Sequence, residues 1–93
     1  MKKIEDLKDG DFIAFGFNYN GGESDEIIVS NITSKHRDEF LVHFMYGHSS
    51  LGEYVKPENI VAIGNTEGHT KIKGWSGNFD LISSEHLLNK LLE

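Results

Sequence analysis

The stretch GHSSLG, residues 47–52, holds two adjacent serines, Ser49 and Ser50, which are the first residues to test for nucleophilic chemistry. A hydrolase that presents its serine on a tight strand-to-helix turn needs glycine two residues before and two residues after it, because that turn is sterically crowded. Ser49 has Gly47 before it but a leucine after it, and Ser50 has Gly52 after it but a histidine before it. Both registers fail, and no helical pattern follows. We therefore predict no catalytic residue and no enzyme.

Histidine is the next residue type that could do chemistry, because its imidazole ring is a common ligand for zinc and other transition metals. A zinc site needs three or four converging ligands, often from paired spacings on one element. The chain has no His-x-His or His-Glu-x-x-His pair, and no cysteine that could supply a thiolate. The sequence therefore predicts no metal and no cofactor. The histidines are expected to be scattered over the surface and the strand edges: His36, His43, His48, His69 and His86.

Acidic side chains gather in the stretch NYNGGESDE, residues 18–26. Its Asn-Gly-Gly sequence tolerates the positive φ values of tight turns, so the stretch is expected to form the tip of a hairpin. Its oxygens do not follow the register of a calcium loop. The tip is either a solvated turn or a surface that accelerates docking on a basic protein. Together with side chains near other strand ends, the expected protein-interaction residues are Tyr19, Glu23, Asp25, Glu26, Tyr46, His48 and Tyr54.

A second candidate site lies in KIKGWSGNF, residues 71–79. Lys71 and Lys73 are two residues apart, so they project from one face of a strand, beside Trp75. Lysines can act as point charges toward a phosphate, and an indole ring can stack on a base. The glycines on either side of the tryptophan would let backbone amides approach an anion. These three side chains form the candidate site for a nucleotide-like anionic molecule, and an ordinary exposed hairpin is the simpler interpretation.

The composition limits the classes of function. The chain has 93 residues, enough for one domain, and a formal net charge of −6. An acidic domain is repelled by phosphate backbones, so general nucleic-acid binding is disfavoured and a basic protein surface is a better electrostatic match. No run of about 18 apolar residues is present, and the first lysines precede no apolar run, so neither a membrane span nor a signal peptide is expected. These features and the lack of cysteine favour a cytoplasmic protein.

The candidate residues must be positioned by short strands. Aromatic and β-branched residues, separated by turn residues at intervals of about 8–12, are typical of a small barrel or sandwich. Strand 39–46 has apolar residues at both alternating sets of positions, so we expect it to be covered on both faces. GHSSLG is expected to be a turn. The expected strands are 11–17, 27–33, 39–46, 53–57, 60–63, 70–75 and 79–82.

The end of the chain, residues 83–93, is predicted to be a helix. Ser83 or Ser84 can cap it, and the glutamate in its first turn and the lysine near its end suit the helix dipole. Its leucines recur at helical spacing and form an apolar stripe that must be covered, either by the rest of the chain or by a second copy. The residues of this possible homodimer interface are Leu87, Leu88, Leu91 and Leu92. At the other end, Ile4 and Leu7 predict one helical turn or a packed lead-in.

Two stretches resemble SH3-like barrels. LKDGDFIAF looks like the opening of such barrels, where a loop ending in Gly-Asp enters the first strand. FLVHFMYG followed by GEYVKPENIVAI resembles the Tudor and PWWP type, where a strand ending in aromatic-x-Gly is followed by a short strand, a helical turn and a closing strand. The resemblance covers residues 7–63. It implies a small barrel whose rings can form a cage for a methylated lysine or arginine, although no cage motif can be matched residue by residue.

These features predict a mostly β protein with a single domain over residues 1–93. Residues 7–63 are expected to form a small antiparallel SH3-like barrel or roll, 64–82 additional strands, and 83–93 a short C-terminal α-helix. The expected function is that of a non-enzymatic acidic adaptor or inhibitor that docks on a protein, of the size found among phage and bacterial accessory proteins. The alternative is a binder of a nucleotide-like anionic small molecule, at a homo-oligomer interface.

Overall fold

The structure, a computed structural model, describes residues 3–18, 26–72, 74–82 and 85–91. These ranges contain seven strands, two short 3-10 helices and one α-helix. In chain order the elements are η1 (Ile4–Asp6), β1 (Phe12–Phe17), β2 (Glu26–His36), β3 (Glu39–Tyr46), β4 (Ser49–Val55), η3 (Pro57–Asn59), β5 (Ile60–Gly64), β6 (Thr70–Lys71), β7 (Asn78–Leu81) and α1 (Glu85–Leu91). No helix within the described ranges combines the length and the hydropathy that crossing a membrane requires.

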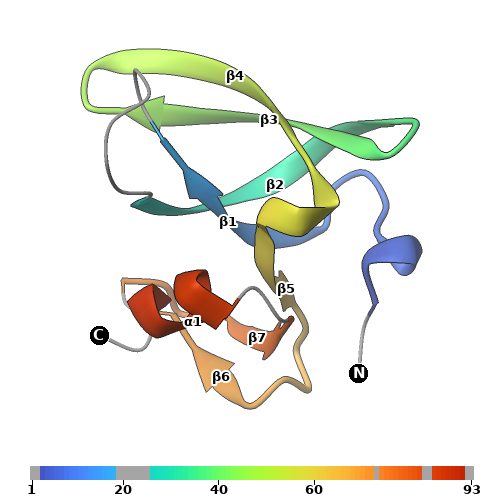
Figure 1. Cartoon of the computed structure of the whole chain (residues 1–93), viewed down its shortest axis with the longest axis vertical. Helices are drawn as coiled ribbons and strands as arrows, with labels where there is room; N and C mark the ends of the chain where they lie inside the picture. The colour runs from blue at the N-terminus through green and yellow to red at the C-terminus, as the bar shows by residue number, and fades with distance from the viewer. Residues whose placement is uncertain (1–2, 19–25, 73, 83–84, 92–93) are drawn as a thin grey trace.

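The described strands form one antiparallel sheet in the order β4-β3-β2-β1-β5-β7-β6. The hairpin β3–β4 lies at the top of Figure 1, and β6, β7 and α1 lie at the bottom, with β1 and β2 between them. The prediction of a mostly β, antiparallel fold with a short C-terminal helix is confirmed. The sheet curves strongly but is not closed into a barrel, because β4 and β6 remain its two edges.

The hairpins are longer than the sequence predicted. β2 runs to His36, beyond its expected range of 27–33. β4 begins at Ser49, so most of the GHSSLG stretch belongs to a strand, and the turn consists of Gly47 and His48. Gly47 has a φ of 62°, which glycine adopts without steric cost. The prediction ended β2 too early and began β4 too late because exposed polar residues in a strand look like turn residues until a partner strand is present.

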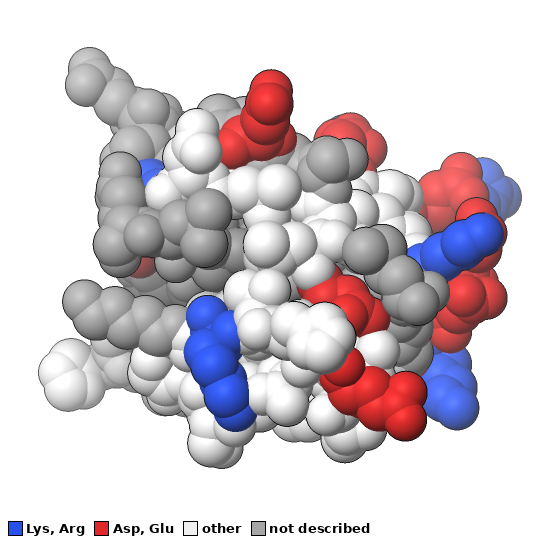
Figure 2. Space-filling model, turned by 90° about the horizontal axis from the view of Figure 1, so that it is seen from below, with Lys and Arg blue, Asp and Glu red and all other residues white. Residues whose placement is uncertain are grey.

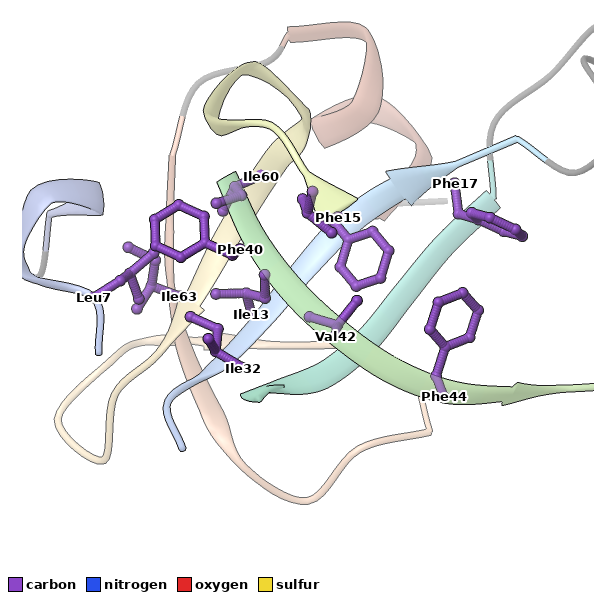
Figure 3. Close-up of a cluster of buried hydrophobic side chains, with 11 residues drawn as sticks. Leu7, Ile13, Phe15, Phe17, Ile32, Phe40, Val42, Phe44, Ile60 and Ile63 are labelled. Carbon is purple, nitrogen blue, oxygen red and sulfur yellow. The ribbon is translucent and has the colours of Figure 1, made fainter. Parts of the chain in front are cut away.

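The larger core lies inside the curve of the sheet (Figure 3). The rings of Phe15 and Phe17 on β1 pack edge-on against Phe44 on β3, with centroid distances of 5.8 and 5.1 Å. Since β1 and β3 are not neighbours in the sheet, these contacts hold the hairpin β3–β4 over β1. The buried members of this core are Leu7, Ile13, Phe15, Phe17, Ile32, Phe40, Val42, Phe44, Val55, Ile60 and Ile63.

A second, smaller core covers the opposite face of β1 and β5. Ala14 lies between two larger-core residues on β1, Ala62 precedes the larger-core residue Ile63 on β5, and both alanines are fully buried. Leu87 of α1 is only 2% exposed, so the helix packs on this face of the sheet. The buried members are Ala14, Val29, Val61, Ala62, Ile72, Phe79 and Leu87. The single sheet therefore has a covered layer on each face at its centre.

The prediction that strand 39–46 is covered on both faces is wrong. Phe40 and Val42 point into the larger core, but on the other face His43 is exposed and Met45 is 65% exposed. The second core contains no described residue of β3, because α1 and the segment from β6 to β7 cover the opposite side of the sheet only as far as β2. Met45 is therefore left as a surface residue.

Replacing Gly68 by alanine is expected to lower the free energy of unfolding by about 1–3 kcal/mol, a cost typical of overpacking. Gly68 is buried in the connection between β5 and β6, and a Cβ atom there would lie 2.5 Å from the backbone oxygen of Phe79. The control is Gly77→Ala, whose Cβ would meet its nearest neighbour at 3.9 Å. Urea denaturation followed by circular dichroism measures both, and equal stability of the two variants would contradict this packing.

Candidate functional site

Four large hydrophobic side chains of the described residues are exposed, and three of them line one depression. Phe12 and Trp75 are 47% and 45% exposed, and their ring centroids lie 6.4 Å apart at an interplanar angle of 54°. Both rings, together with Met45, line the same depression. The fourth side chain, Tyr54, lies elsewhere on the hairpin β3–β4. Exposed apolar side chains that gather in this way mark interaction surfaces more often than isolated ones do.

A hollow of about 510 Å³ lies on one side of the Phe12–Trp75 pair. We call it the Trp75 hollow. The buried ring of Phe79 contributes to its lining, and polar groups from the start of β1, the end of β5 and the start of β7 surround the rings. Its lining residues are Gly10, Asp11, Phe12, Gly64, Asn65, Thr66, Trp75, Ser76, Gly77, Asn78 and Phe79.

A second depression, of about 440 Å³, lies along the uncovered face of β2 and β3. We call it the Met45 groove. It is lined by Phe12, Ile27, Ile28, Val29, Ser30, Asn31, His43, Phe44, Met45 and Trp75. Because Phe12 and Trp75 line both depressions, the hollow and the groove form one continuous surface with the two rings at its centre.

A tight turn before β1 places Asp11 at the hollow. The Asp11 N–H donates to the Lys8 carbonyl at 3.1 Å, and Gly10 between them has a φ of 91°, as the third residue of a type II turn requires. The Gly10 N–H donates to the Ile32 carbonyl at 2.8 Å, and the Ile32 N–H donates to the Asp11 carbonyl at 2.8 Å. These bonds extend the pairing of β1 with β2 and fix the backbone of Asp11.

Asn65 organises the opposite side of the hollow. Its Oδ1 accepts the Glu67 N–H at 3.1 Å, and its Nδ2 donates to Oδ2 of Asp80 at 2.7 Å. Its backbone N–H donates to the Asn78 carbonyl at 2.9 Å, and Nδ2 of Asn78 donates to the Thr66 carbonyl at 3.2 Å. The bond to the Glu67 N–H lies within the turn after β5, and the other bonds join this turn to β7. The polar lining is therefore preformed.

The segment that carries Trp75 is held by two contacts of its own. The Trp75 N–H donates to the Ile72 carbonyl at 2.9 Å, and Gly74 has a φ of 85° within this turn. Nζ of Lys71 donates to the Ser76 carbonyl at 3.1 Å. The predicted strand 70–75 therefore ends early, at Lys71, because the glycine turn reverses the chain.

The described lining of the hollow is almost entirely uncharged. Asp11 is the only charged residue among the described residues that line it. In the view of Figure 2, from below the orientation of Figure 1, uncharged surface occupies much of the face, and both acidic and basic side chains lie on it and around it. The Lys71 ammonium lies on the Ser76 carbonyl at the rim, so charges of both signs lie at this face.

The predicted protein-interaction residues do not form one described surface. Tyr46 is half-buried beside Phe17, with ring centroids 5.4 Å apart, and lies next to the exposed turn residue His48. Tyr54 pairs with Leu41 at the other end of the hairpin β3–β4, and its ring lies 5.6 Å from that of His36. Glu26 is exposed at the start of β2. The remaining residues of that set, Tyr19, Glu23 and Asp25, lie outside the described residues.

The predicted ligand-binding residues are partly brought together. Trp75 lines the hollow, whereas the ammonium group of Lys71 contacts a backbone carbonyl of the Trp75 segment. Lys73 lies outside the described residues. Lys71 thus supports the segment that carries the indole.

The described histidines make contacts within the sheet. Nδ1 of His43 lies 3.0 Å from Oγ1 of Thr33, and Nε2 of His36 lies 2.7 Å from Oγ of Ser34. Within the described ranges, no group of three or more His, Asp or Glu side chains could hold a metal ion.

The leucine stripe of the helix is described in part. Leu87 and Leu88 pack against the second core of the same chain. The side chain of Leu91 and all of Leu92 lie outside the described part of the chain. Homodimerisation through this stripe stays a prediction.

The sequence alone did not identify Phe12, Asp11, Met45 or Asn65 as site residues. One signal was present: Phe12, Ala14 and Gly16 share one face of β1, so a large ring stands at the end of a row of small residues. The other three residues join the site only through pairing between segments that are distant in the sequence.

No family model, no curated protein and no solved structure matches this chain.

Asn65→Ala is expected to lower the free energy of unfolding by about 1–3 kcal/mol, because it removes the acceptor of the Glu67 N–H and one hydrogen-bond donor to the Asp80 carboxylate. We also expect the amide NMR signals of Trp75 and Asn78 to shift, since the network supports the hollow. Asn89→Ala, on the exposed face of α1, is the matched control and should cost little. Thermal denaturation and a proton–nitrogen correlation spectrum measure both effects, and an unchanged spectrum for Asn65→Ala would argue against a preformed lining.

Proposed function

We propose that this protein is a non-enzymatic binding module that docks on a protein with a basic surface and acts as an adaptor or inhibitor. The observation that carries the proposal is the gathering of Phe12, Met45 and Trp75 on one continuous surface. The proposed contact surface consists of the Trp75 hollow and the Met45 groove. The acidic hairpin tip predicted from the sequence stays a candidate for a second contact.

The side chains of this surface are of the kinds that protein interfaces use. Aromatic residues and methionine are enriched in interfaces, and an apolar centre with a polar rim is the common arrangement. Here Phe12 and Trp75 form the centre, and Asp11, Asn65 and Asn78 lie at its edge. Since the chain carries a net charge of −6, a basic partner would be attracted over a longer range as well.

We further propose that residues 7–63 form an SH3-like roll of the Tudor or PWWP type. The order of elements supports this, because β4 leads through the helical turn η3 into β5, which pairs with β1. Tyr46 and Tyr54 lie on opposite faces of the hairpin β3–β4, so they are not two walls of one cage. The proposed surface depends instead on Trp75, which lies beyond the part of the chain that carries the resemblance.

A binder of a nucleotide-like anionic molecule is the second candidate function. The observation that favours it is the size of the Trp75 hollow, about 510 Å³, which is within the range of small-molecule sites. The carboxylate of Asp11 opposes a phosphate in this hollow. A homo-oligomer interface would have to supply further cationic groups.

Trp75→Ala is expected to reduce capture of the natural partner strongly, because central aromatic side chains contribute most of the binding energy of an interface. The tagged protein is used to capture proteins from a lysate of its native host, and the partner identified is purified for titration calorimetry. Asn89→Ala, on the exposed face of α1, is the control. Equal binding by wild type and Trp75→Ala would overturn the proposed surface.

A panel of nucleoside mono-, di- and triphosphates separates the two candidate functions. The proposed protein-binding function predicts that none of them raises the melting temperature. A rise that depends on nucleotide concentration and is lost in Trp75→Ala would establish the second candidate instead.

A further inference from the structure

We propose that Met45 is a reversible oxidation site and that methionine sulfoxide at this position weakens docking on the partner. The oxidant is a peroxide, which converts the thioether of a methionine into a polar sulfoxide. The effect on docking rests on the proposed function, because Met45 lines the proposed contact surface. Three features of the residue carry the proposal: its exposure, its neighbours in the groove, and its separation from both cores.

Exposure makes the Met45 sulfur accessible to a small oxidant. The side chain is 65% exposed, the largest exposed fraction among the four exposed large hydrophobic residues that the structure describes. It stands on the face of β3 that α1 leaves uncovered, opposite Ser50 of β4. The chain has no cysteine, so no thiol competes for the oxidant. The other methionine of the chain, Met1, lies outside the described residues.

The oxidation step transfers one oxygen atom and two electrons. A lone pair of the Met45 sulfur attacks one oxygen of hydrogen peroxide, the O–O bond breaks, and an S–O bond forms. The sulfur is oxidised and the peroxide is reduced, and the second oxygen takes up the proton of the first and leaves as water. Methionine sulfoxide reductases reverse the modification, so the residue can return to its apolar state.

The neighbours of Met45 link its oxidation to binding. Phe12 and Trp75 line the same groove, so Met45 supplies part of the apolar surface that a partner would cover. Methionine suits such a surface because its thioether is apolar and its unbranched side chain adapts its shape. A sulfoxide carries a strong hydrogen-bond acceptor that water solvates, and covering it without a donor costs free energy. Oxidation is therefore expected to weaken docking.

The oxidised protein is expected to keep its fold. Phe44 and Tyr46, the neighbours of Met45 along β3, pack into or against the larger core, but Met45 belongs to neither core. A sulfoxide inside a core would disrupt its packing, whereas the oxygen added at position 45 lies at the surface. Loss of binding would thus reflect the contact surface and not unfolding.

The first experiment measures how fast Met45 is oxidised. The folded protein is treated with dilute hydrogen peroxide, and tryptic digestion with mass spectrometry follows the gain of one oxygen atom in the peptide that contains Met45. We expect a rate constant within about fivefold of that of free N-acetylmethionine amide, because access to the sulfur limits the reaction. A larger reduction of the rate constant would overturn the assignment of the site.

The second experiment measures docking. The partner identified by capture is titrated with the reduced protein and with the oxidised protein, and melting curves check that both forms are folded. We expect the dissociation constant to rise by about tenfold on oxidation. Treatment with the two methionine sulfoxide reductases, one for each epimer, should restore the original value. Equal dissociation constants for the two forms would overturn the effect on docking.

Met45→Leu is the matched control, because leucine keeps an apolar side chain of similar volume and has no sulfur to oxidise. This variant retains Met1 and every other residue of the chain. Its affinity for the partner should not change on treatment with peroxide. An equal loss of affinity in Met45→Leu and in the wild type would assign the effect to another residue and would overturn the proposal.

The failure of this inference is distinguishable from the failure of the proposed function. If Trp75→Ala loses the partner but oxidation of Met45 leaves binding unchanged, the docking surface stands and the effect of oxidation is rejected. If capture of the partner does not depend on Trp75, the docking surface is rejected, and the effect of oxidation on docking is rejected with it.

Discussion

The rest of the structure depends on the burial of β1 on both faces. β1 pairs with β2 on one edge and with β5 on the other, so its backbone is bonded on both sides. Ile13 and Phe15 enter the larger core, and Ala14 enters the core beneath α1. A small protein buries only a modest fraction of its surface. Sharing one strand between two cores lets this chain hold a hairpin on one side and a helix on the other.

The candidate site follows from the point at which this double coverage ends. Phe12 is the first residue of β1 and lies on the same face as Ala14, but α1 does not extend over it, and its ring meets Trp75 instead. Across the sheet, a Cβ atom on Gly64 would lie 3.0 Å from Cβ of Phe12. A glycine at this position lets the backbone and Cβ of Phe12 lie close to the end of β5. The hollow is thus the uncovered end of the second core, and the polar turns before β1 and after β5 border it.

The sequence predicted most of the strands because their apolar alternation is a local property. The range 39–46 agrees with β3, where Phe40, Val42 and Phe44 face inward. The exposure of the other face of β3 was not predicted, because how far α1 extends over the sheet depends on tertiary packing. Trp75 could be selected as a rare exposed aromatic residue in a glycine-rich stretch. Asp11 and Asn65 could not, since their positions depend on hydrogen bonds to Ile32, Asn78 and Asp80 that link distant segments.

The two walls of the hollow differ in how they are supported. Phe12 belongs to the most enclosed strand of the sheet, and moving it would disturb the ladder between β1 and β5. Trp75 follows a turn between β6 and β7. Its segment is held by the hydrogen bond from the Trp75 N–H to the Ile72 carbonyl and by the one from Lys71 Nζ to the Ser76 carbonyl. Any widening on complex formation must therefore come from the tryptophan side. In the proposed complex, the Phe12 side of the hollow would cost little entropy on binding, and the Trp75 segment would set the width of the partner group that fits.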